Sequence, residues 1–265
     1  MTRLTPTGLA IAAVLVLLLA LLTARLQRRL GGQVLIAALR TTVQLLLIGL
    51  VLDVLFANAH LAWVALLSLV MLAAAGREVR ARQNRRLRGP WGYSVGAISM
   101  FISSFAVTVL ALVVIVRHQP WYDPQYAIPL LGMLLGNTMN GVSIAMDRFT
   151  DAAWARRGEI EARLLLGQTA SEATSELRKE SVGAGLIPII NAMSAAGLVS
   201  LPGMMTGQIL AGSPPTEAVK YQILIMFLIA VGTGLGTLAA VAITARRIVD
   251  ERQRLRLERL APSRR

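Results

Sequence analysis

Long runs of apolar residues dominate this 265-residue sequence and limit what it can fold into. A helix needs about 20 consecutive apolar residues to cross the hydrocarbon core of a bilayer, and several runs approach that length. Hydrophobic residues make up 55% of the chain and charged residues only 15%, whereas a soluble domain carries about a quarter charged residues. The sequence therefore predicts an all-α, polytopic bundle of transmembrane helices.

The apolar runs predict about seven spans. The first run follows Arg3 and resembles a signal peptide, but no small-residue cleavage pattern follows it, so we interpret it as a retained helix. Residues 1–245 then form one transmembrane domain that includes a cytoplasmic segment at 147–185. The predicted spans lie near residues 8–24, 34–57, 60–76, 95–116, 126–146, 186–212 and 219–245.

The positions of the basic residues predict the orientation of the chain. Short loops rich in Lys and Arg stay in the cytoplasm. Most of the 27 Lys and Arg residues lie in four alternate stretches, at 25–33, 77–94, 147–185 and after residue 245. We therefore expect the N-terminus outside and the C-terminus inside, with 246–265 as a basic cytoplasmic tail. This placement attributes the net charge of +13 to topology and to anionic lipid of the bilayer, and predicts no nucleic-acid partner.

The largest cytoplasmic stretch has a helical pattern at 151–180 that is too polar to enter the membrane. Gly167 interrupts it, and Thr169 with Glu172 three residues later predicts a capping box that starts a second short helix through Lys179. The segment is either an ordinary amphipathic connector or a lever that inserts into a partner protein. As a lever, its candidate contact residues are Glu159, Glu161, Ala162, Leu164 and Gly167.

Polar side chains inside the predicted spans are candidates for a transport path, because such groups are costly in hydrocarbon unless they face protein or water. Arg40 either snorkels to the cytoplasmic interface or pairs with Asp147 at the end of the fifth span. Gly132 and Gly136 form a GxxxG pair, so the polar stripe of that span is equally a helix-packing contact. The path candidates are Arg40, Gln44, Asn137, Asn140, Ser143, Asn191 and Gln208.

The sixth predicted span contains Pro202-Gly203, which should break the helix and free backbone carbonyls. Broken membrane helices often mark transport sites. Five methionines in this region and in the fifth span are either soft thioether contacts for a metal or space-filling side chains. They are Met133, Met139, Met193, Met204 and Met205.

Several kinds of chemistry are missing from the sequence. The chain has no cysteine and only two histidines, which excludes disulfides and thiolate metal sites. Neither Lys179 nor Lys220 follows a glycine, so there is no Walker A loop, and no HExxH or GxSxG motif occurs. We see no carboxylate-rich cage for a hard cation within the spans, so the metal ligands are unknown. Energy for transport is then expected from a partner chain or from an ion gradient.

Three blocks identify a resemblance: GMLLGNTMN at 132–140, LIPIINAM at 186–193 and GLVSLPGMMTGQILAG at 197–212. They strongly resemble the FetB-type iron-export ABC transporter permease family, and the plant aluminium-sensitivity permeases look similar. The resemblance implies a permease homodimer with two separate ABC ATPase subunits in the cell (plasma or inner) membrane. It also implies export of a metal, with iron suspected, and ATP bound by the partner and no cofactor bound by this chain.

Two other classes of function remain as alternatives. A stand-alone ion-coupled carrier would favour ionisable residues at mid-bilayer, and among the predicted spans only Arg40 qualifies. A membrane enzyme or scaffold would need a catalytic set, and none is recognisable. The permease interpretation is therefore the one that we carry forward.

Overall fold

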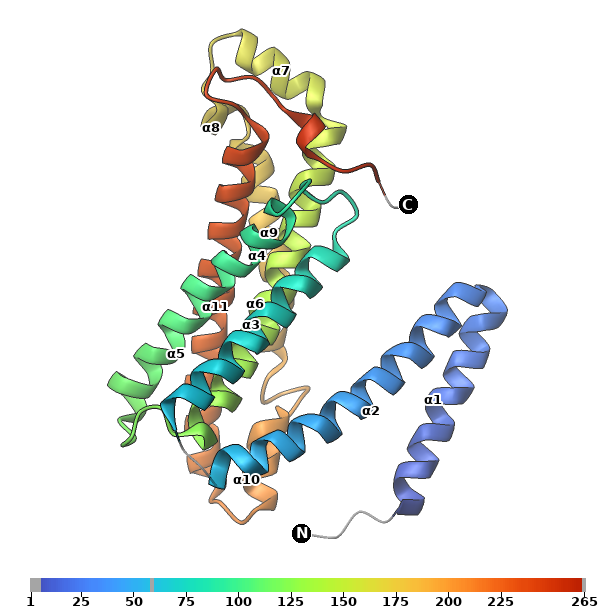
Figure 1. Cartoon of the computed structure of the whole chain (residues 1–265), viewed down its shortest axis with the longest axis vertical. Coiled ribbons are helices and arrows are strands. Elements are labelled where there is room, and N and C mark those ends of the chain that lie inside the picture. Colours follow the sequence, from blue (N-terminus) through green and yellow to red (C-terminus); the bar gives the residue numbers. More distant parts are fainter. Residues whose placement is uncertain (1–5, 58–59, 264–265) are drawn as a thin grey trace. The chain divides into compact units, whose positions relative to one another are not determined.

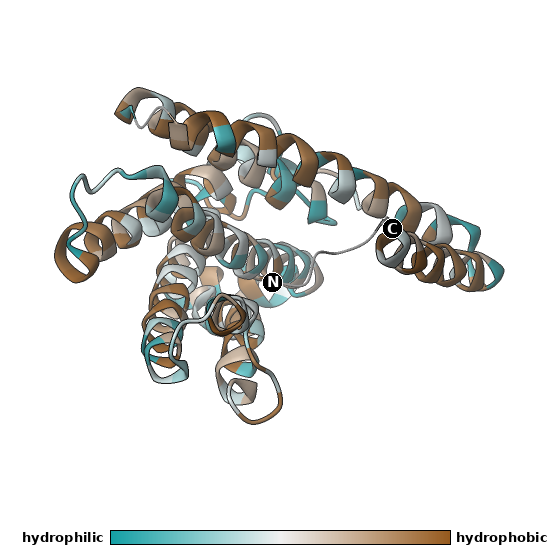
Figure 2. Ribbon diagram, turned by 90° about the horizontal axis from the view of Figure 1, so that it is seen from below, coloured by the Kyte–Doolittle hydropathy of each residue, from teal (hydrophilic) through white to brown (hydrophobic). Residues whose placement is uncertain are grey.

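The computed structural model describes residues 6–57 and 60–263. These residues form helices joined by short connections, and the chain divides into two compact units, residues 1–60 and 61–265 (Figure 1). Six of the described helices are long and apolar enough to cross a membrane. Hydrophobic residues run along most of the length of these helices (Figure 2). The all-α, multi-pass character predicted from the sequence is thus confirmed.

The first unit is a hairpin of two antiparallel helices, α1 (Pro6–Leu26) and α2 (Arg28–Ala57). The helices approach closely beside the turn because residue 31 is glycine. A Cβ atom placed on Gly31 would lie only 2.5 Å from the Cβ of Ala24. Most other side chains of the hairpin are apolar and exposed, as expected for helices surrounded by lipid.

The second unit is a bundle in which α6, α9 and α11 form the centre and α3 and α4 pack against them. The helix from Trp91 to Val116 is continuous but contains two π-helical turns, η1 and η2. The elements are α3 (Leu61–Arg82), α4 (Trp91–Met100), η1 (Phe101–Phe105), α5 (Ala106–Leu110), η2 (Ala111–Val116), α6 (Pro124–Ala155), α7 (Arg157–Leu165), α8 (Ala170–Ala173), α9 (Ser175–Ala195), α10 (Gly203–Leu210), α11 (Pro215–Ile248) and η3 (Leu257–Arg259).

Six of the seven predicted spans correspond to single continuous helices, and the sixth predicted span is the exception. The predicted span at 186–212 consists of the second half of α9, an irregular stretch at 196–202, and α10. The break predicted at Pro202-Gly203 is present, with Pro202 directly before α10, but the helix has already ended at Ala195. Together α9 and α10 lead from the end of the bundle that carries α7 to the end where α11 begins (Figure 1).

The central helices of the second unit cross in backbone contact at two glycines. A Cβ on Gly141 of α6 would lie 2.9 Å from the carbonyl oxygen of Gly185 in α9, and Thr237 of α11 is 3.0 Å away. Small residues allow this approach in a bilayer, where close packing holds helices together. The GxxxG pair predicted to do this is not the contact, because Gly136 has nothing within 4 Å of its Cβ position.

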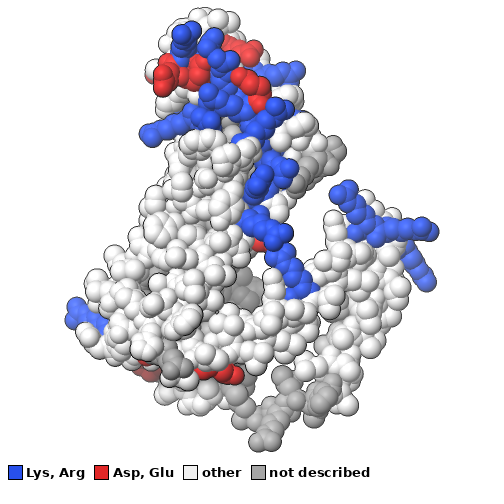
Figure 3. Space-filling view, in the orientation of Figure 1, with Lys and Arg blue, Asp and Glu red and all other residues white. Residues whose placement is uncertain are grey.

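Charged side chains of the second unit gather at the end that carries α7 and α8 (Figure 3). Three of the predicted basic stretches meet there, namely the connection after α3, the connection between α6 and α9, and the tail after α11. The basic stretches therefore share one end of the bundle, as a membrane-embedded unit with one basic face requires. Which side of the membrane this face occupies stays a prediction.

Candidate functional site: a coupling segment and two cavities

The connection between α6 and α9 is a short projecting helix pair at the charged end of the second unit. It is narrower than the predicted 147–185, because α6 continues to Ala155 and α9 begins at Ser175. We call residues 156–174 the coupling segment. It contains α7, a turn in which Gly167 has a φ of 84°, and α8. Glycine adopts this left-handed conformation without the steric cost that other residues pay.

The capping box predicted at Thr169 is confirmed. The Thr169 hydroxyl accepts from the backbone N–H of Glu172 at 3.3 Å, and the Glu172 carboxylate accepts from the backbone N–H of Thr169 at 2.8 Å. Hydrogen bonds from the Thr169 backbone and then from its side chain lower the pKa of Glu172. The second helix is shorter than predicted, however, because α8 ends at Ala173 and a new helix starts after Thr174.

Ion pairs attach the coupling segment to α9. The Arg156 guanidinium donates to both carboxylate oxygens of Glu180 at 2.8 Å. This hydrogen bonding, followed by the charge of Glu180, raises the pKa of Arg156 above its ordinary value. Arg163 pairs with Glu159 at 2.6 Å and lies 3.7 Å from Glu176 of α9. Both hydrogen bonds to Glu180 come from one guanidinium nitrogen, and with the Arg163–Glu176 contact they join α7 and its N-cap residue to α9.

The five predicted contact residues of the segment have different surroundings. Glu159 is engaged with Arg163, and Leu164 is half-buried against the core. Glu161 and Ala162 are exposed, and Gly167 forms the turn. Sequence reasoning missed the most exposed apolar pair of the coupling segment, Leu165 and Leu166, whose exposed fractions are 88% and 84%. The sequence feature that could have indicated them is a pair of large apolar residues directly before a glycine turn, in an otherwise polar segment.

The basic tail is folded against the charged end rather than extended. Leu260 pairs in an isolated β-bridge with Leu87 in the connection after α3, and both side chains are almost completely buried. The backbone N–H of Ala261 donates to the carbonyl of Arg86 at 2.8 Å. The tail also reaches the coupling segment, because the Gln253 side-chain oxygen accepts from the backbone N–H of Ala170 at 2.6 Å.

A cavity of about 690 Å³ lies between the tail, the coupling segment and the connection after α3. Trp154 forms part of its wall, with the Arg85 guanidinium 4.3 Å and the Arg157 guanidinium 5.7 Å from the ring centroid. Arg85 also lies 3.5 Å from the carboxylate of Asp151. The predicted contact residue Glu161 lines the same cavity. Aromatic stacking and charge thus join the base of α7 to the connection after α3.

The predicted path residues of α6 bind to neighbouring elements or to their own helix. Asn140 accepts from the Arg82 guanidinium of α3 at 2.6 Å, and Asp147 accepts from the backbone N–H of Asn84 at 2.6 Å. Asn137 donates to the carbonyl of its own Met133, and Ser143 to that of its own Asn140. The contact of Asn140 joins α6 to α3, and sequence reasoning did not foresee its partner.

The remaining path candidates are scattered. Arg40 and Gln44 lie one turn apart on α2 in the first unit, and the pairing of Arg40 with Asp147 stays a prediction. Asn191 is exposed on α9. Gln208 of α10 is half-buried, and its side-chain oxygen is buried without a hydrogen-bond partner. The structure therefore does not assemble the five candidates of the second unit into one site.

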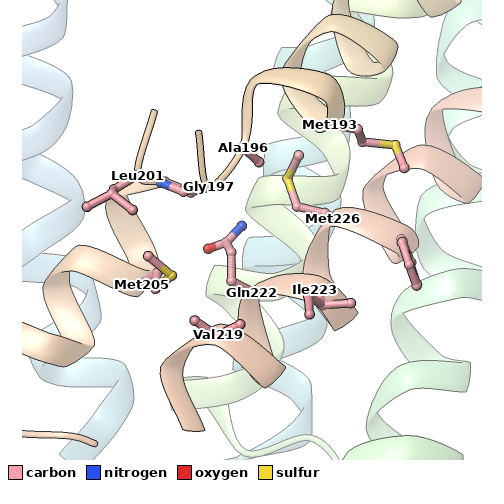
Figure 4. Close-up of a pocket in the computed structure, with 11 residues that line it drawn as sticks. Met193, Ala196, Gly197, Leu201, Met205, Val219, Gln222, Ile223 and Met226 are labelled. Atoms are coloured by element: carbon pink, nitrogen blue, oxygen red, sulfur yellow. The ribbon is translucent and has the colours of Figure 1, made fainter. Parts of the chain in front are cut away.

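Two cavities flank α10 at the end of the second unit opposite the coupling segment. The larger, of about 510 Å³, lies between α9, the irregular stretch, α10 and α11 (Figure 4). Met205 and Met226 lie on either side of Gln222 in this cavity (Figure 4). The smaller, of about 250 Å³, includes Met133, Met204 and Gln208. Among the described residues, no group of three or more His, Cys, Asp or Glu could hold a metal ion.

Comparison with known proteins places the chain in a family. A family model described as "Uncharacterised protein family (UPF0014)" matches residues 6–249. The chain belongs to this family. The UPF0014 match covers both units to the end of α11, whereas most of the tail lies beyond it. The coupling segment and the two cavities beside α10 are therefore within the family region. No solved structure matches the chain.

The UPF0014 relatives are membrane proteins. The chain is 43% identical over 230 residues to a UPF0014 membrane protein of Synechocystis, with 85% of this chain and 86% of the relative covered. It is 32% identical to the "Probable iron export permease protein FetB" of Escherichia coli, covering 96% of this chain and 95% of the relative. It is 33% identical to "Protein ALUMINUM SENSITIVE 3" of Arabidopsis thaliana, covering 82% and 77%. The resemblance seen in the sequence is thus confirmed, and the chain is a multi-pass membrane protein.

Proposed function

We propose that this UPF0014 protein is the membrane-spanning permease subunit of an ABC transporter that exports a metal, with iron as the first candidate. Two copies would pair with two separate ATPase subunits in the cell membrane, and ATP would be bound by those subunits. The relative named as a probable iron export permease supports the metal and the direction, since the two sequences align over nearly their whole lengths.

The observation that carries the proposal is the exposed, apolar tip of the coupling segment. Leu165 and Leu166 are 88% and 84% exposed at the end of a helix that ion pairs hold in place. At the charged end of the bundle these side chains face water, where large exposed apolar residues beside each other are unfavourable unless a partner covers them. We therefore expect the two leucine side chains to insert into a groove of a partner protein. Buried apolar anchors of this kind supply most of the binding energy of an interface.

The same segment is connected to the helices that a transport cycle would have to move. It links the end of α6 directly to the start of α9, and these two helices cross in backbone contact at Gly141 and Gly185. A displacement of the tip by an ATPase would therefore act on both helices at once. Packed helices can shift as rigid bodies between two discrete arrangements. A displacement at the coupling segment would therefore also shift the opposite ends of α6 and α9.

Binding of the purified chain to its ATPase tests this proposal. The partner to use is a small ATPase with a Walker A motif, sought first in the reading frames beside this one. Leu166→Asp should weaken binding about 30-fold, because loss of an anchor residue costs about 2 kcal/mol or more. Gln168→Asp is the matched control, since it adds the same charge two residues away at an exposed polar position. The proposal is wrong if the ATPase does not bind, or if both variants bind it equally well.

A further inference from the structure

The two cavities beside α10 are lined by the same kinds of side chain. The larger contains the thioethers of Met193, Met205 and Met226, and the smaller those of Met133 and Met204. Half of the ten methionines of the chain therefore line two cavities that share α10 and α11 as walls. Methionines that only fill space would be spread through the core. The gathering of five methionine side chains around two cavities therefore suggests a second role for them.

Each cavity also contains one amide oxygen that has no hydrogen-bond partner. Gln222 of α11 is only 8% exposed, and its Oε1 is buried and unpartnered in the larger cavity. Gln208 of α10 has a buried, unpartnered Oε1 in the smaller one. A buried oxygen without a partner costs about 1–3 kcal/mol. A rotation of the amide would turn this oxygen toward the cavity, where a bound cation would offset that cost. The amide of Gln222 extends into the space between Met205 and Met226 (Figure 4).

The charge of the walls limits which cations fit. Neither cavity is lined by a carboxylate, an imidazole or any other ionisable group apart from the phenols of Tyr126 and Tyr221 in the smaller one. The cost of moving an ion out of water rises with the square of its charge, so walls without an opposite charge disfavour divalent and trivalent ions far more than monovalent ones. Thioether sulfur also prefers soft ions to hard ones.

From these observations we propose that the two cavities are successive binding sites for a soft monovalent cation of the Cu(I) or Ag(I) class. The proposal rests on the proposed transport function, but it puts a soft monovalent ion in place of iron, the first candidate there, as the substrate of this path. Met204 and Met205 are neighbours on α10, yet they line opposite cavities. A small rotation of this eight-residue helix, which is joined to α9 by an irregular stretch, moves a thioether from one cavity toward the other.

Direct metal binding by the full-length chain in detergent micelles tests the proposal. Ag(I) is the probe, titrated in chloride-free buffer against a chelator of known affinity, because it binds thioethers without changing oxidation state. The chain has no cysteine to compete for the ion. We expect two Ag(I) ions per chain, and much weaker binding of Fe(II) under the same conditions.

Methionine-to-leucine variants keep side-chain volume and so separate ligation from packing. The double variant Met205→Leu/Met226→Leu should lose one of the two ions, with at least a tenfold fall in affinity at that site. Met133→Leu/Met204→Leu should lose the other. Met100→Leu is the control, because Met100 is fully buried in α4 and lines neither cavity. Gln222→Leu should weaken the site of the larger cavity while leaving the smaller one unchanged.

The inference is overturned if the unaltered chain binds no Ag(I), or if both double variants bind it as the unaltered chain does. This outcome is separable from failure of the proposed function, because the assay needs neither ATP nor a partner. If the ATPase binds the chain and Ag(I) does not, only the soft-cation site is wrong. If Ag(I) binds and the ATPase does not, the transporter assignment is wrong and the site stands.

Discussion

Gly141 and Gly185 hold α6 and α9 in backbone contact, with a Cβ on Gly185 placed only 2.6 Å from the carbonyl oxygen of Gly141. No side chain can yield at this point, since the neighbour is backbone. The contact lies between the two helices that the coupling segment joins. Helix packing and the proposed transmission of movement therefore depend on the same pair of residues.

Gly185→Ala should force α6 and α9 apart. We expect a loss of about 1–3 kcal/mol in stability, the usual cost of overpacking a tight contact. Gly183→Ala on the same helix is the control, because its Cβ position has nothing within 4 Å. That variant should be as stable as the unaltered chain or slightly more so, since alanine favours helix over glycine. Thermal unfolding in detergent, followed by circular dichroism, measures both.

Asn140→Ala should leave the Arg82 guanidinium without the oxygen that it contacts at 2.6 Å. We expect Asn140→Ala and Arg82→Ala each to lower thermal stability, and the double variant to cost less than the sum, with a coupling of about 0.5–3 kcal/mol. Asn140→Asp should retain the contact as a charge pair. Full additivity in the double-mutant cycle would show that the two side chains do not interact.

Leu260→Ala should release the tail, because removing a buried leucine side chain costs about 2–5 kcal/mol. Leu260 is 2% exposed beside Leu87, and the tail beyond α11 has several arginines that trypsin recognises. Limited digestion at Arg252 to Arg259 should therefore become faster in this variant. Glu251→Ala, at an exposed position of the same tail, should digest as the unaltered chain does.

Asp250 should make attachment of the tail dependent on pH. Burial alone raises the pKa of this carboxylate, but hydrogen bonds from Arg254 and Arg256 outweigh it and lower the pKa to about 2. The unfolded tail then takes up the proton first, so the stabilisation is present above about pH 4 and is lost as the pH falls toward 2.

Pepsin, which is active in this acidic range, reports on the change. Cleavage at the tail leucines, normalised to a free peptide of the same sequence, should accelerate between pH 4 and pH 2. In Asp250→Asn the cleavage should be fast throughout and independent of pH. An equal pH dependence in both proteins would show that Asp250 does not control attachment.

Much of the fold could be predicted because a bilayer accepts few structures. Apolar runs long enough to cross it form helices, and the capping box at Thr169 and the break before Gly203 depend only on neighbouring residues. Helix ends were less predictable. α6 continues past Asp147, whose carboxylate accepts a hydrogen bond from the backbone of Asn84, a contact that no local pattern reveals.

The surroundings of the candidate site residues were harder to predict than the helices, because they depend on contacts between distant parts of the chain. Asn140 was chosen as a path residue for its polarity, but its environment is set by Arg82, 58 residues earlier. The folded tail depends on Leu260 meeting Leu87, a contact between distant parts of the chain that the spacing of residues within the tail does not reveal. Gln222 was not among the candidates because a single amide in an apolar helix is noticed only when its cavity is known.

ATP-dependent uptake into sealed inside-out vesicles tests the central claim most directly. Vesicles that carry the chain with its ATPase on the outer surface should accumulate Fe(II) or Ag(I) from the medium only when ATP is added, and Leu166→Asp should reduce that uptake at least tenfold. Vesicles carrying the chain alone should accumulate nothing. If the chain alone moves either ion without ATP, or if the variant exports as the unaltered chain does, the account of a permease driven through its coupling segment is contradicted.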